Sequence, residues 1–361
     1  MPVDRRPERQ SALRRLLEQE GLDALLVTHL PNIRYLTGFT GSAALLLVRP
    51  DATVLLTDFR YAEQAPSEAG TSAAVEVDPV NVWDRLKRIC ADRSGETLGF
   101  EAHALTVRDA GRLRDCVSRT APAGELVERL RAAKAQEEVA AIAAAATLAH
   151  EALAEVLPGV RVGDEERDIA ARLEFALRRR GSEWHPFQTI VASGPRAALP
   201  HARTSDRCVG RGEWLLLDFG AEVDGYCADL TRTCVVGARA DDRQREVYGV
   251  VEAAQRKARG EVRPGMTGRE ADALARGLIT SRGFGEAFGH SLGHGLGLEV
   301  HEAPRLSAAN DRPLPAGAVV TIEPGIYLPG WGGVRLEDDV HLGAEGPRCL
   351  TDGRTELVEL V

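Results

Sequence analysis

The sequence predicts an α/β domain over residues 1–125 followed by an α+β domain over residues 126–361. Three observations support this fold class. The length of 361 residues suits two domains. Short apolar runs alternate with helical segments in the first third of the chain, as in an α/β fold. A long segment rich in Ala, Glu, Lys and Leu then begins at residue 125, and paired strands dominate after it.

Hydrophobic spacing and turn residues define the elements of the first domain. An amphipathic pattern predicts a helix over 10–21 that ends at Gly21. Apolar runs bounded by turn residues predict strands, and longer amphipathic segments predict helices. The expected strands are 23–28, 44–48, 53–57 and 97–102, and the other expected helices are 81–93 and 106–117.

The second domain begins with the segment 125–157, which has no internal Gly or Pro and which we interpret as one long helix or two in tandem. A helix over 164–180 follows, with Asp164 as its N-cap and Gly181 just past its end. Two further helices are expected over 242–259 and 267–282. The remaining apolar runs predict antiparallel hairpins built from strands at 187–193, 213–221, 226–236, 318–323 and 333–341.

Composition and charge argue against several classes of protein. The net charge is −9 and the arginines are scattered among acids, so we expect no nucleic-acid partner. No apolar run approaches the roughly 18 residues of a membrane helix, and the charged start "MPVDRRPERQ" predicts no signal peptide. The six cysteines show no C-x-x-C pair, which favours reduced thiols in a cytoplasmic protein, and the lack of a long apolar run predicts no membrane partner.

Two carboxylates fall where burial is expected, in "LLLDFGAEVDGYCADLTRT" (215–233). A buried, unpaired carboxylate is costly, so Asp218 and Asp229 need a positive partner. The dipeptide Asp224-Gly225 is a strong hairpin signal. A two-residue turn there would place Asp218 opposite Thr231 with Asp229 diagonal to it, whereas a four-residue loop would place the two acids directly opposite each other. Both registers bring the carboxylates within reach of one another.

The same arrangement recurs near the end of the chain, where segment 318–342 carries Glu323 on one apolar run and Glu337 on the next. The segment Gly330–Gly333 supplies the turn. One such acid is more often exposed or paired with a base. Four acids on two matching hairpins instead predict a shared cation site.

Three of the nine histidines lie between these hairpins, in "FGHSLGHGLGLEVHE" (288–302). A lone histidine is more often structural, but His290, His294 and His301 fall within twelve residues and are bracketed by the paired acids. The glycines around them predict a backbone that comes close to a ligand. The combination favours a metal site.

The order Asp218, Asp229, His294, Glu323, Glu337 resembles the five-ligand dinuclear site of the pita-bread metallopeptidases. The segments "NIRYLTGFTGSAALLLV" (32–48) and "TDFRYAEQA" (57–65) are similar to the amino-terminal domain shared by the Xaa-Pro peptidases and creatinase, which methionine aminopeptidases lack. The resemblance covers nearly the whole chain. It implies a creatinase-like α/β domain and an α+β pita-bread catalytic domain.

Other residues agree with the same resemblance. His290, His294 and His301 match the H-x3-H-x6-H pattern of the Xaa-Pro peptidases. His201 in "LPHA" matches the histidine that lies upstream of the first metal-binding Asp, and Arg335 matches an arginine two residues before the last Glu. No ligand position is substituted.

Charge indicates how many cations the site holds. Four carboxylates carry four negative charges, which two divalent cations would neutralise. Oxygen ligands with one imidazole and no thiolate suit manganese, and cobalt, iron or zinc less distinctively. The resemblance implies that Asp229 and Glu337 bridge the two metals, with Asp218 on one and His294 and Glu323 on the other.

The resemblance also implies a reaction, metal-dependent hydrolysis of the Xaa-Pro peptide bond. Glu323 would move a proton from the nucleophile to the leaving nitrogen, and His301 would stabilise the oxyanion. His290 and His201 would line the pocket. An Xaa-Pro bond has no amide N–H, so a site that relies on carbonyl polarisation accepts it where others do not.

The expected substrate is a dipeptide, because arginines are available to bind its free carboxylate. Arg305 matches the position of a carboxylate-binding arginine in some prolidases. Arg60 in the amino-terminal domain and Arg335 are further candidates for substrate binding. A surface salt bridge is the alternative role for Arg305 or Arg60.

Three alternatives stay open on the sequence alone. An aminopeptidase P would act on longer peptides with the same ligands. A creatinase-like amidinohydrolase shares the fold but lacks the full ligand set. A non-catalytic pita-bread module would only bind a peptide or protein. For the favoured peptidase interpretation we expect a homodimer with a small peptide as its principal partner.

Overall fold

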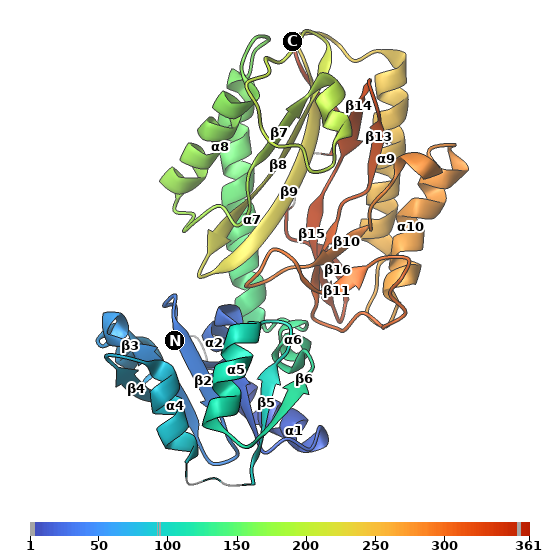
Figure 1. Cartoon of the computed structure of the whole chain (residues 1–361). Coiled ribbons are helices and arrows are strands. Elements are labelled where there is room, and N and C mark those ends of the chain that lie inside the picture. Colours follow the sequence, from blue (N-terminus) through green and yellow to red (C-terminus); the bar gives the residue numbers. More distant parts are fainter. Residues whose placement is uncertain (1–3, 92, 94, 352–354) are drawn as a thin grey trace. The chain divides into compact units, whose positions relative to one another are not determined.

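The computed structural model describes residues 4–91, 93, 95–351 and 355–361 (Figure 1). The chain divides into two compact units, Met1–Arg131 and Ala132–Val361. The division falls after Arg131 rather than after residue 125, because helix α6 (Leu126–Arg131) contacts helix α1 (Arg6–Gln19) within the first unit. Arg131 Nη1 also donates a 2.7 Å hydrogen bond to Asn32 Oδ1 in that unit. The segment 125–157 is two helices in tandem, α6 and α7 (Gln136–Val156).

The first unit is built on one mixed sheet with the strand order β4-β3-β2-β1-β5-β6. Strand β1 pairs antiparallel with β2 and parallel with β5. Trp83 and Leu86 of α4 and Leu113 of α5 pack on one face, and helices α1, α2 and α6 contact one another on the other. The strands are β1 (Ala24–Val27), β2 (Ala44–Val48), β3 (Thr53–Asp58), β4 (Ala74–Asp78), β5 (Thr97–Glu101) and β6 (Arg119–Ala123), and the remaining helices are α2 (Leu30–Thr37), α3 (Gln64–Ala69), α4 (Val82–Cys90) and α5 (Val107–Cys116).

Each strand and helix expected in the first domain is present, but the sequence analysis missed α2, α3, β4 and β6. Helix α2 is short, and most of its residues are buried, including Asn32 and Thr37. It therefore lacks the continuous polar face, opposite an apolar one, from which an amphipathic helix is recognised in a sequence.

The second unit contains a sheet in the order β17-β9-β8-β7, a sheet in the order β11-β10-β12-β15-β16, and the hairpin β13-β14. Its strands are mostly antiparallel, as expected, although β17 pairs in parallel with β9. The strands are β7 (Ile190–Ser193), β8 (Glu213–Val223), β9 (Tyr226–Val236), β10 (Gly293–Gly295), β11 (Glu302–Leu306), β12 (Val319–Ile322), β13 (Gly325–Leu328), β14 (Gly332–Arg335), β15 (Asp338–Gly343), β16 (Gly346–Cys349) and β17 (Val358–Leu360).

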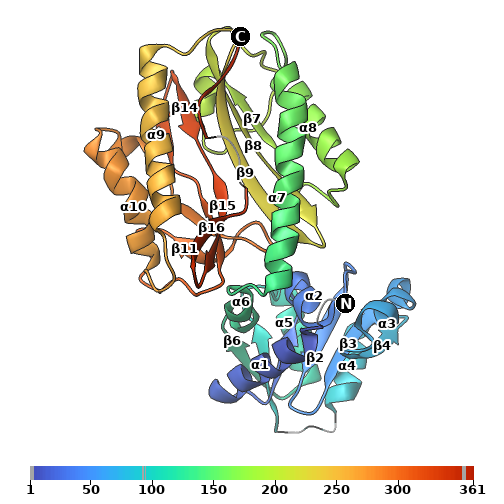
Figure 2. The same ribbon diagram turned by 180° about the vertical axis from the view of Figure 1, so that it is seen from behind.

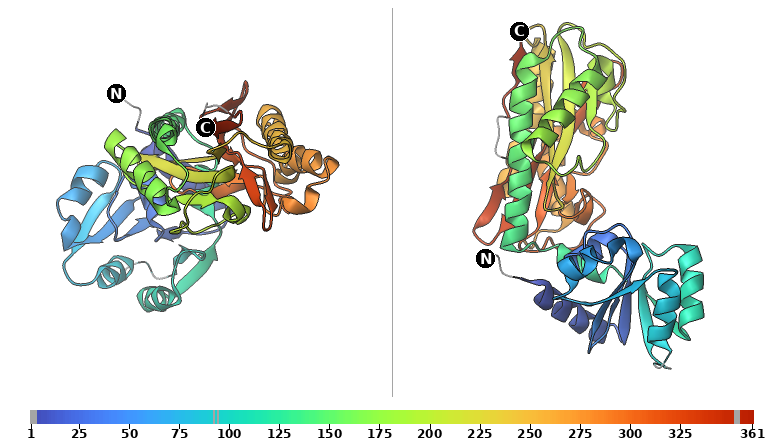
Figure 3. Two further views of the ribbon diagram at one scale, coloured as in Figure 1. Left: turned by 90° about the horizontal axis from the view of Figure 1, so that it is seen from above. Right: turned by 90° about the vertical axis from the view of Figure 1, so that its left-hand side faces the viewer.

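Helices cover the outer side of these sheets. Figure 2, seen from behind, shows α7 running in front of β8 and β9, and α9 (Asp242–Glu261) running in front of β14 and β15. Figure 3 shows α8 (Glu166–Arg180) beside α7. Helix α10 (Gly268–Ser281) packs on α9. The buried residues Ala149, Leu173 and Leu217 belong to one core between α7, α8 and β8.

Helix α7, continued through Gly159, is long and apolar enough to cross a membrane, contrary to the expectation that no segment would be. Its alanine-rich face, including Ala145 and Ala149, is fully buried against the sheet and α8. Close packing in the core accounts for this apolar composition, and core helices of soluble proteins pass the same test.

Two details of the second unit differ from the sequence expectation. Helix α8 begins at Glu166 with Glu165 as its N-cap, and Asp164 instead accepts hydrogen bonds from the Arg161 N–H and Arg172 Nη2. The strand expected over 333–341 is two strands, β14 and β15, because the chain passes from the β13-β14 hairpin to the other sheet at positions 336–337.

Candidate metal centre

The predicted ligands all line one cavity of about 470 Å³ in the second unit. Residues from β8, β9, β10, β11, β14 and the intervening loops form its wall. The other predicted site residues of this unit line the same cavity; they are His201, His290, His301, Arg305 and Arg335. The tertiary structure therefore brings together predicted site residues as distant in the chain as His201 and Glu337.

Asp218 and Asp229 come from the long hairpin β8–β9. The chain makes a two-residue turn at Asp224 and Gly225, whose φ angles are 50° and 73°. Positive φ at both positions matches the right-handed twist of the strands. Asp218 faces Thr231 and Asp229 faces Gly220, so the two-residue register is confirmed. The two carboxylates lie diagonal to one another on one face.

Glu323 and Glu337 occupy the point where the chain leaves one sheet for another. The last pair of the β12–β15 ladder joins Ile322 to Asp338, and the β13–β14 hairpin starts beyond Pro324. The Glu337 N–H donates to Thr231 O at 3.2 Å, which ties this junction to β9. The two glutamates therefore project from a break between ladders rather than from a regular hairpin.

His294 lies on β10 between two glycines. A Cβ atom at Gly293 would lie 2.0 Å from Thr321 O, and one at Gly295 would lie 2.2 Å from Ala303 O. The glycines therefore let β10 approach its neighbouring strands, and the expectation that they also bring the backbone close to a ligand stays a prediction. The His294 Nδ1 lies 3.1 Å from Gly295 O, which leaves Nε2 directed at Glu323 Oε1, 3.3 Å away.

The donor atoms converge in the manner of a cation site. One ligand atom each from Asp229, His294 and Glu337 lie within 4.8 Å of one another, and all three residues are buried. Glu323 adjoins this group through His294. Among the described residues, Asp218 Oδ1 and Asp229 Oδ1 are buried without a hydrogen-bond partner. Such oxygens are costly unless a cation or water meets them.

Electrostatics lead to the same conclusion. Burial, followed by repulsion from Asp218 and Asp339, raises the pKa of Asp229 well above its usual value. Burial and repulsion from Asp229 likewise raise the pKa of Glu337. Burial opposes ionisation of Glu323 too, but the hydrogen bond and charge of His294, together with the charges of His290 and Arg335, outweigh it and lower the pKa to about 2. Crowded buried carboxylates of this kind are compensated by bound divalent cations.

Arg335 is a structural partner of the cluster. Its Nη2 donates to Asp218 Oδ2, its Nε donates to Thr231 Oγ1 at 3.1 Å, and its Nη1 donates to Tyr327 Oη at 2.8 Å. Thr231 Oγ1 in turn donates to Glu337 Oε2 at 2.5 Å. Arg335 is buried, so these bonds account for its charge. The roles of Thr231 and Tyr327 were not predicted, because neither has a distinctive motif around it.

His290 and His301 differ in what their rings can do. His290 has Nδ1 2.8 Å from Ser291 O and Nε2 2.8 Å from Tyr327 Oη, so both ring nitrogens are occupied by protein groups. His301 is exposed, and its ring centroid lies 4.3 Å from that of His294. Partial removal of the ring from water on its cavity side, followed by the charge of His294, lowers the pKa of His301 to about 4. A neutral His301 can donate one hydrogen bond into the cavity.

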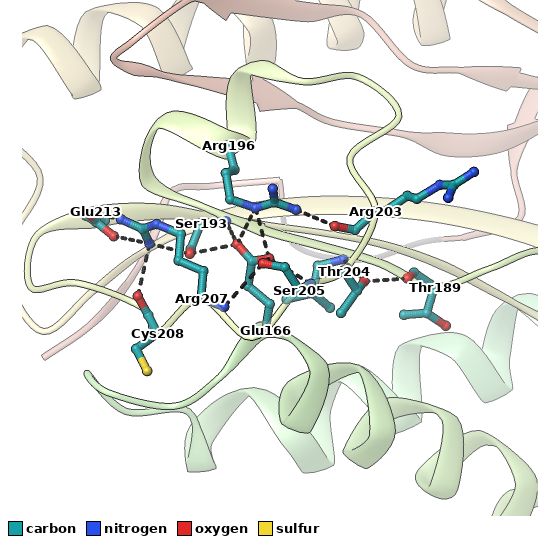
Figure 4. Close-up of polar contacts among 11 residues, drawn as sticks. Glu166, Thr189, Ser193, Arg196, Arg203, Thr204, Ser205, Arg207, Cys208 and Glu213 are labelled. Atoms are coloured by element: carbon teal, nitrogen blue, oxygen red, sulfur yellow. Dashed lines mark hydrogen bonds and ion pairs between the residues drawn. The ribbon is translucent and has the colours of Figure 1, made fainter.

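The loop that carries His201 is held by a buried acid (Figure 4). Glu166 at the start of α8 accepts hydrogen bonds from the Ser193 N–H at 2.8 Å, Arg196 Nε at 3.1 Å and Ser205 Oγ at 2.7 Å. Glu166 is fully buried. These contacts fix both ends of the segment in which His201 lies, and nothing in the sequence pattern indicated them.

The predicted carboxylate-binding arginines are placed differently from one another. Arg305 lines the cavity, is exposed, and forms no ion pair with any described residue, so the surface salt bridge considered as an alternative is absent there. Arg203 is another exposed arginine on the cavity wall and was missed. Arg60 belongs to the first unit, where Nη2 pairs with Asp58 Oδ2 at 2.8 Å, and its role in the site stays a prediction.

Comparison with known proteins identifies the family of both units. The model of metallopeptidase family M24 matches residues 140–344, and the model of the Creatinase/Prolidase N-terminal domain matches residues 9–133. The chain is 35% identical over 354 residues to the Xaa-Pro dipeptidase of Pyrococcus furiosus, which covers 97% of this chain and 99% of that one.

Solved structures agree in fold. The Xaa-Pro dipeptidase from Bacillus anthracis has a TM-score of 0.95 and 39% identity, with 98% of this chain and 100% of that chain covered. The X-Pro aminopeptidase from Thermotoga maritima has a TM-score of 0.89 and 38% identity, with 97% of this chain and 99% of that chain covered.

The fold and the cluster of buried acids are those of a metal-dependent peptidase. The chain belongs to metallopeptidase family M24, whose members use divalent metal ions. The first unit is the creatinase-like domain and the second is the pita-bread catalytic domain, as the resemblance implied.

Proposed function

We propose that the protein is an Xaa-Pro dipeptidase. The observation that carries the proposal is Arg305, which has no ion-pair partner in the described part of the chain and lies on the wall of the cavity that holds the acid cluster. A dipeptide has its free carboxylate one residue beyond the scissile bond, and a guanidinium is the group best suited to bind it. The Bacillus anthracis and Pyrococcus furiosus relatives, which are named Xaa-Pro dipeptidases, support the same proposal.

The buried donor set fits two divalent cations. Asp218, Asp229, His294, Glu323 and Glu337 would hold them, with Asp229 and Glu337 contributing to both. Cations bound there would polarise the substrate carbonyl and make water more acidic. We propose manganese, because carboxylate oxygens predominate and no thiolate is present.

The remaining steps belong to side chains of the protein. Glu323 is ionised at neutral pH and can take a proton from the attacking water and return it to the proline nitrogen as that nitrogen leaves. His301 can donate a hydrogen bond to the oxygen that becomes negative in the transition state. His290 contributes shape rather than a proton, since Tyr327 and Ser291 O occupy its nitrogens.

The substrate panel Leu-Pro, Ala-Pro, Ala-Ala and Ala-Pro-Ala tests the proposal on the manganese-loaded protein. We expect the Xaa-Pro dipeptides to be cleaved best and Ala-Ala poorly. If neither Xaa-Pro dipeptide is hydrolysed, the proposal fails.

The alternative is an Xaa-Pro aminopeptidase, which the likeness to the Thermotoga maritima structure favours. Faster cleavage of Ala-Pro-Ala than of Ala-Pro would establish it. We further propose that the enzyme is a cytoplasmic homodimer. Light scattering of the purified protein tests the dimer, and fractionation of cells that express it tests the location.

A further inference from the structure

The first unit has a topological switch point between β1 and β5. From β1 the chain passes outward to β2, β3 and β4, and it later returns to β5 and passes outward to β6 on the other side. Strands β1 and β5 are parallel neighbours, with Leu26 beside Phe100. In open α/β sheets, the crevice at the carboxyl ends of such a strand pair is where ligands bind.

Metal-ligating side chains meet at this crevice. His29 follows β1 and His103 follows β5. Glu128 of α6 reaches them from the neighbouring helix. Glu128 Oε1 lies 2.9 Å from His103 Nε2 and 3.7 Å from His29 Nδ1, and one ligand atom from each of the three residues falls within 4.8 Å of the others.

The carboxylate is fixed by surrounding groups. Asn32 Nδ2 donates to Glu128 Oε1 at 2.5 Å and to Glu101 Oε1 at 2.7 Å. Glu101 Oε2 accepts from the backbone N–H of His29 at 2.8 Å, so the same acid also holds the histidine backbone. Hydrogen bonds that orient ligating residues in this way are typical of metal sites.

The carboxylate is also largely removed from water. The Glu128 side chain is 13% exposed, and its Oε2 is buried without a hydrogen-bond partner among the described residues. The two imidazoles are 26% and 33% exposed, so the site is open to solvent on the histidine side.

We propose that His29, His103 and Glu128 bind a divalent transition-metal ion of the zinc class in the creatinase-like domain, separately from the peptidase centre. Two imidazoles and one carboxylate, with no thiolate, are a donor set that zinc accepts, and three protein ligands leave one position for water. Zinc–ligand bonds of about 2.0–2.2 Å place tetrahedral ligand atoms ~3.4 Å apart. The distances of 2.9 and 3.7 Å bracket that value, and partly exposed rings can rotate to meet it.

Zinc stoichiometry of the full-length protein tests the proposal. Chelator-stripped protein is dialysed against dilute Zn²⁺ and its zinc content is measured by elemental analysis. We expect wild type to hold one equivalent more than His29→Gln/His103→Gln, and we expect the double variant to keep wild-type activity when loaded with manganese. His185→Gln is the matched control, because His185 belongs to neither cluster of candidate ligands, and it should retain the full zinc content. Equal zinc content in wild type and double variant would refute the site.

A measurement on wild type alone covers the case in which the double variant does not fold. Zn²⁺ should protect His29 and His103 from modification by diethyl pyrocarbonate, as mapped by mass spectrometry, while His185 reacts equally with and without the metal. If His29 and His103 are modified at the same rate in both conditions, the histidines serve only as hydrogen-bond partners of Glu128 and the proposal is wrong.

Discussion

Replacing Arg305 with Met gives the sharpest test of how the cavity selects its substrate. The guanidinium lines the cavity and has no ion-pair partner among the described residues, so its charge is available to a substrate carboxylate. Methionine removes the charge and retains part of the apolar stem. We expect the variant to lose preference for substrates that end in a free carboxylate one residue after the scissile bond.

The exposure of Arg305 sets the size of the effect. Hydrogen bonds to charged groups contribute ~1.5–3 kcal/mol, whereas solvent-exposed ion pairs contribute ~0.2–1 kcal/mol. Arg305 is exposed in the free chain and becomes partly desolvated when a substrate fills the cavity, so a value between these ranges applies. About 1.4 kcal/mol corresponds to a factor of about 10.

The assay compares kcat/KM for Leu-Pro and for Leu-Pro amide, which differ in the terminal charge and little in size. Arg305→Met should lower the value for Leu-Pro about tenfold and leave the amide nearly unchanged. Arg203→Met is the matched control, because Arg203 is also an exposed arginine on the cavity wall. Equal losses on both substrates would show that Arg305 is structural. A selective loss in Arg203→Met instead would assign the clamp to that residue.

Three further predictions concern other parts of the second unit. Glu337→Gln should lower the content of both metals and nearly abolish hydrolysis; elemental analysis that finds two tightly held ions in this variant would contradict the bridging role. Glu166→Ala should lower the free energy of unfolding by ~3–5 kcal/mol in urea titrations, because it leaves Arg196 without its buried partner; a change below ~1 kcal/mol, as for surface ion pairs, would show that Glu166 does not anchor the loop. Burial, followed by the charge of Arg348, lowers the pKa of His341 below its usual ~6.5. Wild type should therefore lose stability as the pH falls through and below that value, and His341→Gln should not share this loss. Parallel stability curves of the two proteins between pH 7.5 and 5.5 would exclude this contribution of His341.

The sequence carried most of the information about the class of fold. Apolar runs such as 44–48 and 53–57 are long enough and well enough bounded to be recognised as strands without tertiary context. Helix α2 was not recognised, because burial on most of its surface removes the polar face that reveals an amphipathic helix. Asp164 was wrongly assigned as an N-cap, because its carboxylate accepts a hydrogen bond from the side chain of Arg172 on the following helix, a contact that the sequence pattern does not reveal.

The four acids were also recognisable from the sequence, since carboxylates are chemically unusual in apolar runs, whereas the choice of His294 among three clustered histidines came from the family resemblance. Their local patterns left the hairpin register undecided between two turn lengths. The folded chain chose the two-residue turn, because Asp224 and Gly225 can both adopt the positive φ angles that match the twist of β8 and β9. The diagonal placement of Asp218 and Asp229 therefore follows from that turn.

Other features were decided only by tertiary structure. Arg335 forms an ion pair with Asp218. Tyr327 Oη lies within hydrogen-bond distance of His290 Nε2. Glu166 accepts hydrogen bonds from the segment that carries His201. Each contact joins residues from different elements, and local hydrophobic periodicity says nothing about which polar groups meet once those elements pack. The sequence by itself determined the class of fold of each unit and the order of the acids and histidines along the chain. Only the packed structure decided which donor atoms share a cavity, because convergence there depends on contacts between segments distant in the chain.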